Sequence, residues 1–365
     1  MAILEDRFGV PPFTVLNTNQ GYWGSRKKQW NSIGIESEVG RDATSYNIKD
    51  WLDEKREDGE LTGHVNLVDT SIFDPVLTEL SYKWFCKPNG TILDPFCGGS
   101  VRGIVAGALG YEYTGIELRE EQVTANYDNV PKLSIDLAVD PVWLEGDSMN
   151  IKNIGGEYDM VFSCPPYYDL EEYSNDPRDL SHMSYPRFVE QYTKIIKNAC
   201  SMLKPDSFAV FVVGEIRDKE GFYRNFVGDT IKAFTSSGMK YYNEAILFTS
   251  INTASLRVTK QFEPYRKFAK VHQNILVFYK GNTDRITQMD MENNKFTPLK
   301  ELKQEKRIRK RVLVGRKLEE NQMDTVMPDT DIICDVCKFK SKDKEQYEWH
   351  LTRRYHQEVV EQNGM

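Results

Sequence analysis

The chain has 365 residues, of which 40% are hydrophobic, 12% aromatic and 28% charged, a composition that supports a sizeable core and excludes global disorder. Its net charge of -8 excludes a generally basic nucleic-acid coat, although a local positive surface would be enough for such binding. The N-terminus lacks a basic segment followed by an apolar one, and no run of about 18 apolar residues occurs. We therefore expect a cytoplasmic protein with no membrane partner, in which the six cysteines are free thiols or metal ligands.

The first 65 residues are polar, aromatic and irregular, and they predict an N-terminal extension or lid. From residue 66 to 282, short β-rich apolar runs alternate with helical patterns, which is typical of a parallel sheet with crossover helices. The expected fold class is α/β, a doubly wound Rossmann-like sheet of about seven strands. The expected strands lie within residues 90–96, 111–118, 141–147, 158–164, 207–216, 243–250 and 274–280, and two of the helices within 186–205 and 223–239. The last two runs leave little room for a helix between them, which predicts an antiparallel edge pair.

The segment "TILDPFCGGSVRGIVAGALG", residues 91–110, runs from an apolar strand through Gly98 and Gly99 into a helix rich in small residues. Ligand crevices in open α/β sheets lie at the carboxyl ends of strands, where glycines let the backbone approach a ligand closely. The segment contains neither the dinucleotide fingerprint nor a P-loop. It predicts a cofactor site, with a plain structural turn as the alternative.

Two acids follow at the ends of the next two expected strands. Glu117 comes about twenty residues after the glycines, where a carboxylate can accept hydrogen bonds from ribose hydroxyls. Asp147 ends the following strand, where a carboxylate could accept from an adenine amino group. Either acid alone could cap a helix or lie on the surface, but three strand ends in order indicate a nucleoside-binding edge.

The apolar run "YDMVF" stops at "SCPPYYD", residues 163–169. With "DPFCGGS", Glu117 and Asp147, this segment resembles the S-adenosylmethionine-dependent DNA amino-methyltransferases, which methylate N6 of adenine or N4 of cytosine. The resemblance covers roughly residues 66–280 and implies a methyltransferase domain there. Residues 73–88 resemble the helix that closes the family's cofactor pocket, and the N-terminal segment resembles methylases encoded by phages and prophages, which implies a host cytoplasm.

The resemblance implies roles for individual residues. The cofactor-binding set is Asp94, Pro95, Phe96, Gly98, Gly99, Glu117, Asp147 and Ser163, and the catalytic set is Ser163, Cys164, Pro165, Pro166 and Tyr167. In the family, the first side chain of the proline motif and the carbonyl of its first proline accept hydrogen bonds from the target amine, and the aromatic ring stacks on the base. The amine then attacks the methyl group directly, with the base flipped out of double-stranded DNA.

One residue departs from this motif, because Cys164 stands where the family has Asp, Asn or Ser. A thiol is a weak hydrogen-bond acceptor. Either the Pro165 carbonyl therefore accepts most of the hydrogen bonding from the target amine, or Ser163 also accepts from it. A second hypothesis makes Cys164 a nucleophile toward a pyrimidine, but it precedes its prolines, whereas the cysteine of cytosine C5-methyltransferases follows a proline. Residues 171–186 are too polar for a core and predict a loop over the target base.

A second chemical module lies at the C-terminal end. Residues 283–330 form a linker that is first basic, with nine Lys or Arg between Lys300 and Lys317, and then acidic. Within residues 331–358, the spacing C-x2-C-x12-H-x5-H of Cys334, Cys337, His350 and His356 predicts a C2H2 zinc finger with structural Zn²⁺. It resembles zinc fingers of the matrin and U1 type, which implies a nucleic-acid partner, with a protein-binding finger as the alternative.

The leading hypothesis is a DNA methyltransferase specific for adenine N6 or cytosine N4. The alternatives are an RNA base methyltransferase, because guanine N2 enzymes also use a proline-proline-aromatic corner, and a nucleic-acid-binding protein whose methylase domain has decayed. The sequence does not distinguish adenine from cytosine, and it leaves open whether a restriction nuclease is paired with this chain.

Overall fold

The fold is described from a computed structural model, which defines residues 2–36, 73–168, 176–249, 251, 254–288, 296, 299, 332–333 and 340–341. The helices are α1 (Ala2–Phe8), α2 (Gly21–Ser32), α4 (Pro75–Phe85), α5 (Val101–Ala108), α6 (Glu120–Asn129), α7 (Tyr185–Ser201), α8 (Phe226–Ser236) and α9 (Ala254–Tyr265). The short 3-10 helices are η1 (Val130–Lys132), η2 (Ser148–Ile154), η4 (Leu180–His182) and η5 (Thr283–Gln288). None of the helices described is both long and apolar enough to cross a membrane.

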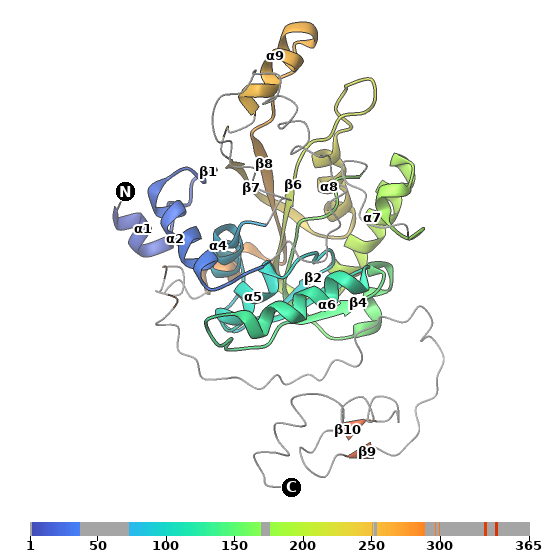
Figure 1. Cartoon of the computed structure of the whole chain (residues 1–365). Coiled ribbons are helices and arrows are strands. Elements are labelled where there is room, and N and C mark those ends of the chain that lie inside the picture. Colours follow the sequence, from blue (N-terminus) through green and yellow to red (C-terminus); the bar gives the residue numbers. More distant parts are fainter. Residues whose placement is uncertain are drawn as a thin grey trace.

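The main sheet has eight strands in the order β1-β7-β8-β6-β5-β2-β3-β4 (Figure 1). They are β1 (Val15–Asn17), β2 (Thr91–Asp94), β3 (Glu112–Glu117), β4 (Val142–Glu145), β5 (Tyr158–Ser163), β6 (Leu203–Val213), β7 (Lys240–Phe248) and β8 (His272–Lys280). All neighbouring pairs are parallel except those that β8 makes with β6 and β7. The chain order reverses between β2 and β5, and this switch point is where α/β sheets bind ligands.

Two hydrophobic clusters cover the two faces of the sheet. Along β6, Phe208 and Val210 belong to the cluster under α2, α4 and α5, whereas Ala209 and Phe211 belong to the cluster under α7 and α8. This alternation follows from the two-residue period of a strand. Figure 1 shows α1, α2 and α4 on one side of the sheet and α7 and α8 on the other. The predicted doubly wound α/β fold is therefore confirmed.

The N-terminal segment packs against α4 through buried charges. Glu79 is fully buried and accepts hydrogen bonds from both Arg26 (2.7 and 2.8 Å) and Trp30 (2.7 Å), and it pairs with Lys83 at 3.1 Å. Burial lowers the pKa of Lys83, and the carboxylate of Glu79 opposes that effect. Buried charges need such partners because their desolvation is costly. Residues 15–17 also extend the sheet as β1, which pairs with β7.

Three expectations need correction or qualification. The last two strands are antiparallel as predicted, but they do not form the edge, because β1 lies outside β7. A helix does fit between them, since α9 projects beyond the strand ends rather than crossing the sheet (Figure 1). Residues 332–333 and 340–341 pair as the antiparallel strands β9 and β10, whereas the zinc-ligand residues Cys334, Cys337, His350 and His356 lie outside the described residues.

Candidate active site

A cavity of about 490 Å³ opens at the carboxyl edge of the sheet, around the switch point between β2 and β5. This volume lies in the range of small-molecule and cofactor sites. Most of the residues singled out from the sequence line it, namely Pro95, Phe96, Gly98, Gly99, Glu117, Asp147, Cys164, Pro165, Pro166 and Tyr167. The fold thus brings together segments that are up to 72 residues apart in the chain, from Pro95 to Tyr167.

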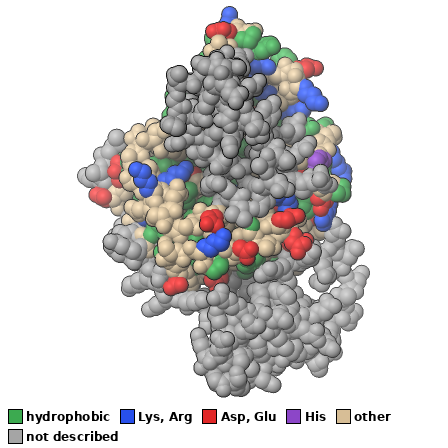
Figure 2. Space-filling view, in the orientation of Figure 1, with side chains coloured by type: hydrophobic (Ala, Val, Ile, Leu, Met, Phe, Trp, Pro, Cys, Tyr) green, Lys and Arg blue, Asp and Glu red, His purple; other side chains and the backbone are tan. Residues whose placement is uncertain are grey.

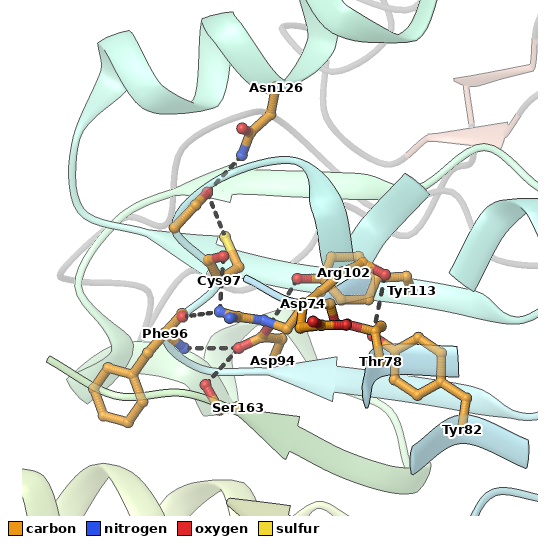
Figure 3. A network of polar contacts seen from close by, with 11 residues as sticks. Asp74, Thr78, Tyr82, Asp94, Phe96, Cys97, Arg102, Tyr113, Asn126 and Ser163 are labelled. Atoms are coloured by element: carbon orange, nitrogen blue, oxygen red, sulfur yellow. Dashed lines mark hydrogen bonds and ion pairs between the residues drawn. The ribbon is translucent and has the colours of Figure 1, made fainter. Parts of the chain in front are cut away.

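Asp94 lies beneath the cavity rather than in its lining, and its carboxylate is fully buried (Figure 3). Its Oδ2 accepts hydrogen bonds from Arg102 Nε at 2.6 Å and from Tyr113 at 2.8 Å. Its Oδ1 accepts from Ser163 Oγ at 2.6 Å and from the backbone N–H of Phe96 at 3.2 Å. Asp94 therefore joins the strand end that leads into the glycines to the strand end that leads into the prolines.

Arg102 completes this buried network. Its Nη2 donates to the carbonyls of Phe96 and Cys97, while Nε holds Asp94. Burial alone would lower the pKa of the guanidinium, but the adjacent Asp94 raises the pKa of Arg102 overall. The guanidinium also lies 4.7 Å from the ring centroid of Phe73, the residue that precedes α4 by two positions. The arginine thus fixes the shape of the turn around Phe96.

Helix α6 fixes the glycine turn from the opposite side. The amide of Asn126 donates to the carbonyl of Gly98 at 2.7 Å, and Gln122 donates to Asn126 at 3.0 Å. Gly98 adopts φ 51°, a left-handed conformation that favours glycine. Ser148 Oγ donates to the Pro95 carbonyl. The turn is therefore held by side chains from three different elements.

The two acids of the expected nucleoside edge both line the cavity. Glu117 Oε1 accepts from the backbone N–H of Arg119 at 3.1 Å, and its side chain is 15% exposed. Asp147 Oδ1 accepts from the backbone N–H of Met149 at 2.8 Å and so caps η2. Capping and ligand contact are compatible, because a carboxylate has acceptor sites on both oxygens.

The proline corner, residues 164–167, follows directly on β5. Tyr167 is held by Gln273 on β8, whose amide donates to the phenol oxygen at 2.6 Å. Cys164 Sγ lies 3.6 Å from the same oxygen. Ser163 is fully buried and does not line the cavity, because its hydroxyl points to Asp94. Cys164, the two prolines and Tyr167 are therefore the part of this corner that faces the cavity.

The next residue, Tyr168, is part of the core rather than of the cavity. Its ring is 8% exposed, packs against Tyr185 and Phe188 and lies 5.0 Å from the guanidinium of Arg224. Its backbone has φ 54°, which is unusual for a bulky residue and which costs of order 1 kcal/mol or more. Strain of this kind persists only where packing imposes it, and here the buried ring supplies the packing.

Several lining residues were not predicted individually. They are Thr18, Lys27, Arg102, Arg119, Gln122, Ser148, Thr249 and Gln273. One signal was available for Arg102, because a charged residue inside the small-residue helix "VRGIVAGA" must be buried with a partner. Two segments expected near the site also contribute to the cavity lining. Phe73, Asp74 and Leu77 come from residues 73–88, and Arg178, Asp179 and Leu180 come from the polar loop of residues 171–186. Residues 171–175 of that loop lie outside the described residues.

The cavity can hold a nucleoside cofactor, since it combines a glycine turn, two carboxylates and aromatic rings at one sheet edge. In the described part of the chain, no group of three or more His, Cys, Asp or Glu side chains is arranged to bind a metal ion.

No family model matches the chain. Among solved structures, it is similar to magnesium protoporphyrin IX methyltransferase (ChlM) from Synechocystis PCC 6803 with bound SAM, at 14% identity over 66% of this chain and 99% of that one, with a TM-score of 0.38. It is also similar to TrmN from Thermus thermophilus, at 14% identity over 57% of this chain and 49% of that one, with a TM-score of 0.38. A third match is a protein from the same species, Thermus thermophilus, that is provisionally assigned as a DNA modification methylase, at 18% identity over 38% of this chain and 51% of that one, with a TM-score of 0.29. The aligned part spans about half the length of the last two proteins.

Proposed function

We propose that the chain transfers a methyl group from S-adenosylmethionine to the exocyclic amine of adenine (N6) or cytosine (N4) in DNA. The observation that carries this proposal is the meeting of the glycine turn and the proline corner across one cavity, with Asp94 bonded to both strand ends. A transfer reaction needs donor and acceptor held side by side in a fixed geometry, and this arrangement provides it.

The residues that would hold the cofactor are those at the ends of β2, β3 and β4. Glu117 would accept from the ribose hydroxyls, Asp147 from the adenine amino group, and the turn at Gly98 and Gly99 would lie against the methionine part. S-adenosylmethionine, when bound, supplies a methyl group on a positively charged sulfur.

The proline corner would hold the target base. Prolines lack a backbone N–H, so residues 165 and 166 present carbonyl acceptors without competing donors. The Pro165 carbonyl would accept from the target amine, and the ring of Tyr167, held by Gln273, would stack on the base. The amine nitrogen would bond to the methyl carbon as the carbon–sulfur bond breaks, the bond electrons staying on sulfur, and one amine proton would pass to water.

We further propose that Cys334, Cys337, His350 and His356 bind a structural Zn²⁺, and that this finger and the basic segment before it contact nucleic acid. The pairing of β9 with β10 supports a small hairpin at this point, since Cys334 follows β9 directly. The protein would act in a reducing cytoplasm, as thiolate zinc ligands require.

The deciding experiment incubates the zinc-loaded, full-length protein with tritiated S-adenosylmethionine and unmethylated duplex DNA or RNA, then digests the product and identifies the labelled nucleoside. We expect label in N6-methyladenine or N4-methylcytosine from DNA. Tyr167→Ala should lower kcat/KM about 5- to 150-fold by loss of base stacking while cofactor binding is unchanged.

The other outcomes are equally informative. Label in RNA alone would replace this proposal with an RNA base methyltransferase. Measurable cofactor binding without label in DNA or RNA of varied sequence would indicate a decayed methylase domain that only binds nucleic acid. Label in 5-methylcytosine would overturn the assigned chemistry, because it requires attack on the ring by a nucleophile such as Cys164.

A further inference from the structure

Large aromatic side chains are exposed on two connections that leave the carboxyl edge of the sheet beside the cavity. Phe222 is 68% exposed in the connection between β6 and α8, and Tyr265 and Phe268 are 68% and 78% exposed between β7 and β8. Single exposed apolar residues are normal, but a cluster of such rings marks an interaction site. Packing within the fold therefore does not account for the exposure of these rings.

The two connections lie against each other. The ammonium of Lys267 occupies the space beside Gly221 that a side chain would fill, so the segment after α9 touches the turn at residue 221. Within the connections, Arg217 lies 3.9 Å from the ring centroid of Tyr223, and the rings of Phe262 and Phe268 are 5.6 Å apart. Figure 2 shows hydrophobic and basic side chains together, with some acidic ones, at the upper end of the molecule, where Figure 1 places α9.

The charge of this region is positive, in contrast to the net charge of -8 for the chain. We define the aromatic-basic surface by the rings named above and by five cations, Arg217, Lys219, Arg266, Lys267 and Lys270. Four acids, Glu215, Asp218, Glu220 and Glu263, lie in the same two segments. Within the described part of the chain, none of the five cations forms an ion pair with a carboxylate. Cations that are not neutralised and that alternate with rings suit a phosphate backbone with bases beside it.

The aromatic-basic surface is continuous with the proline corner. A Cβ placed on Gly214 would lie 3.7 Å from Cε2 of Tyr167 and 3.9 Å from Cε of Lys270, so both side chains border the same point. Gln273, three residues after Lys270, bonds the phenol of Tyr167. Burial lowers the pKa of Lys270, an effect that the carboxylate of Glu215 opposes. A base held at Tyr167 would therefore have its neighbouring nucleotides over this surface.

We propose that the aromatic-basic surface binds the duplex DNA that flanks the target nucleotide, with the cations on phosphates and the exposed rings against sugars and unstacked bases. This inference rests on the proposed function, because it takes the proline corner as the place of the flipped base. A protein partner would not require cations continuous with a base-stacking ring, so nucleic acid is the occupant that the chemistry favours.

The test uses the full-length protein and a fluorescent DNA duplex, with affinity measured by anisotropy over a range of salt concentrations. Arg266→Gln/Lys267→Gln removes two cations, and we expect the slope of log K against log salt to fall by about 2 relative to the wild type. The matched control is Lys194→Gln/Lys197→Gln, which removes two exposed cations from α7 and should keep the wild-type slope. Phe268→Ala should weaken binding about 5- to 150-fold with an unchanged slope, and Phe13→Ala is its exposed aromatic control.

Cofactor binding, measured on every variant, keeps this inference separate from the proposed function. If the wild type methylates DNA but Arg266→Gln/Lys267→Gln binds DNA with the wild-type affinity and slope, the surface is not the docking site and the function stands. If the wild type binds DNA through this surface without transferring a methyl group, the function fails and the docking site stands. A wild type that binds no duplex DNA, or variants that lose only RNA binding, would overturn the inference.

Discussion

At the scale of single residues, a buried ion pair, Asp94 with Arg102, lies at the strand ends that carry the cavity. Asp94 was predicted as a cofactor ligand from its place in the "DPF" segment, and the structure gives it four hydrogen bonds inside the protein. The sequence could locate this turn because glycine and proline spacing is local information. It could not reveal Arg102 and Ser163 as partners of one carboxylate, because that contact depends on how β2, α5 and β5 pack.

Arg102→Met should destabilise the fold by about 3 to 5 kcal/mol, because it leaves the carboxylate of Asp94 buried without a counter-charge. The measurement is the free energy of unfolding from urea titration. The double variant Asp94→Asn/Arg102→Met should recover part of the loss, and the difference gives the coupling energy between the two side chains. A loss below about 1 kcal/mol for the single variant would show that water reaches this site.

Cys164→Ala should lower kcat no more than about tenfold, because a thiol is a weak acceptor and a single such hydrogen bond contributes about 1 kcal/mol. The measurement is single-turnover methyl transfer at saturating cofactor. Tyr167→Phe, which keeps the ring and removes the hydroxyl bonded by Gln273, is the comparison at the same corner. Complete loss in Cys164→Ala would instead identify the thiol as a nucleophile.

At the scale of elements, the seven strands expected from apolar runs all form. Burial of their central residues gives six of them a continuous apolar signal, whereas the mostly exposed β7 shows it only near its end, around Leu247. Strand β1 was missed, since Val15–Asn17 is only three residues long and Val15 is 56% exposed. Its strand character comes from pairing with β7, which is tertiary information. Helix α9 was missed for a related reason, because it packs on no face of the sheet that would impose a clear pattern on the sequence.

Asp159 of β5 joins β2, β6 and the loop after α4 at the end of the strands away from the cavity. It accepts hydrogen bonds from Thr91 at the start of β2 (2.9 and 3.0 Å) and from Lys204 in β6 (2.8 Å), and it pairs with Lys87 at 2.8 Å. Burial would raise the pKa of Asp159, but the bonds from Lys204, Lys87 and Thr91 lower it below the usual value. The folded state thus holds the ionised form more strongly than the unfolded state does.

From this sign, Asp159 stabilises the fold above the pKa that it has in the unfolded chain, and that stabilisation is lost as the pH falls through the lower folded pKa. Asp159→Asn should therefore lower the free energy of unfolding at pH 7 by about 1 to 3 kcal/mol and flatten its decline below about pH 4. Urea titrations between pH 3 and 7 check this. Asp140→Asn, at an exposed acid before β4, should leave the profile unchanged.

At the scale of the whole molecule, the fold was predictable because strand and helix patterns alternate over more than 200 residues, whereas the cavity was predictable only in part. Turn residues such as Gly98 and Pro165 carry local signals. Lys27 and Gln273, which also line the cavity, lie far apart in the chain and have no sequence feature that places them together. The zinc finger stays a prediction from ligand spacing.

The finger should act as a separate unit from the cavity. We expect the full-length protein to contain about one zinc per chain, and Cys334→Ser should abolish this zinc, because about 25 residues need the metal to fold. Cofactor affinity should not change in Cys334→Ser, while DNA affinity falls. Metal analysis measures the zinc content, and calorimetry measures the two affinities. Zinc that persists in both Cys334→Ser and His356→Ala would refute the assigned ligand set.

The buried carboxylate of Asp94 also bears on how the molecule tolerates its own thermal motion. One oxygen receives the backbone N–H of Phe96 and the hydroxyl of Ser163, so both walls of the cavity take their position from the same atom. Because one oxygen holds both walls, we expect the two walls to move together when strand β2 fluctuates. The gap between them then varies less than either wall does, so alignment is preserved in a site that need not be rigid.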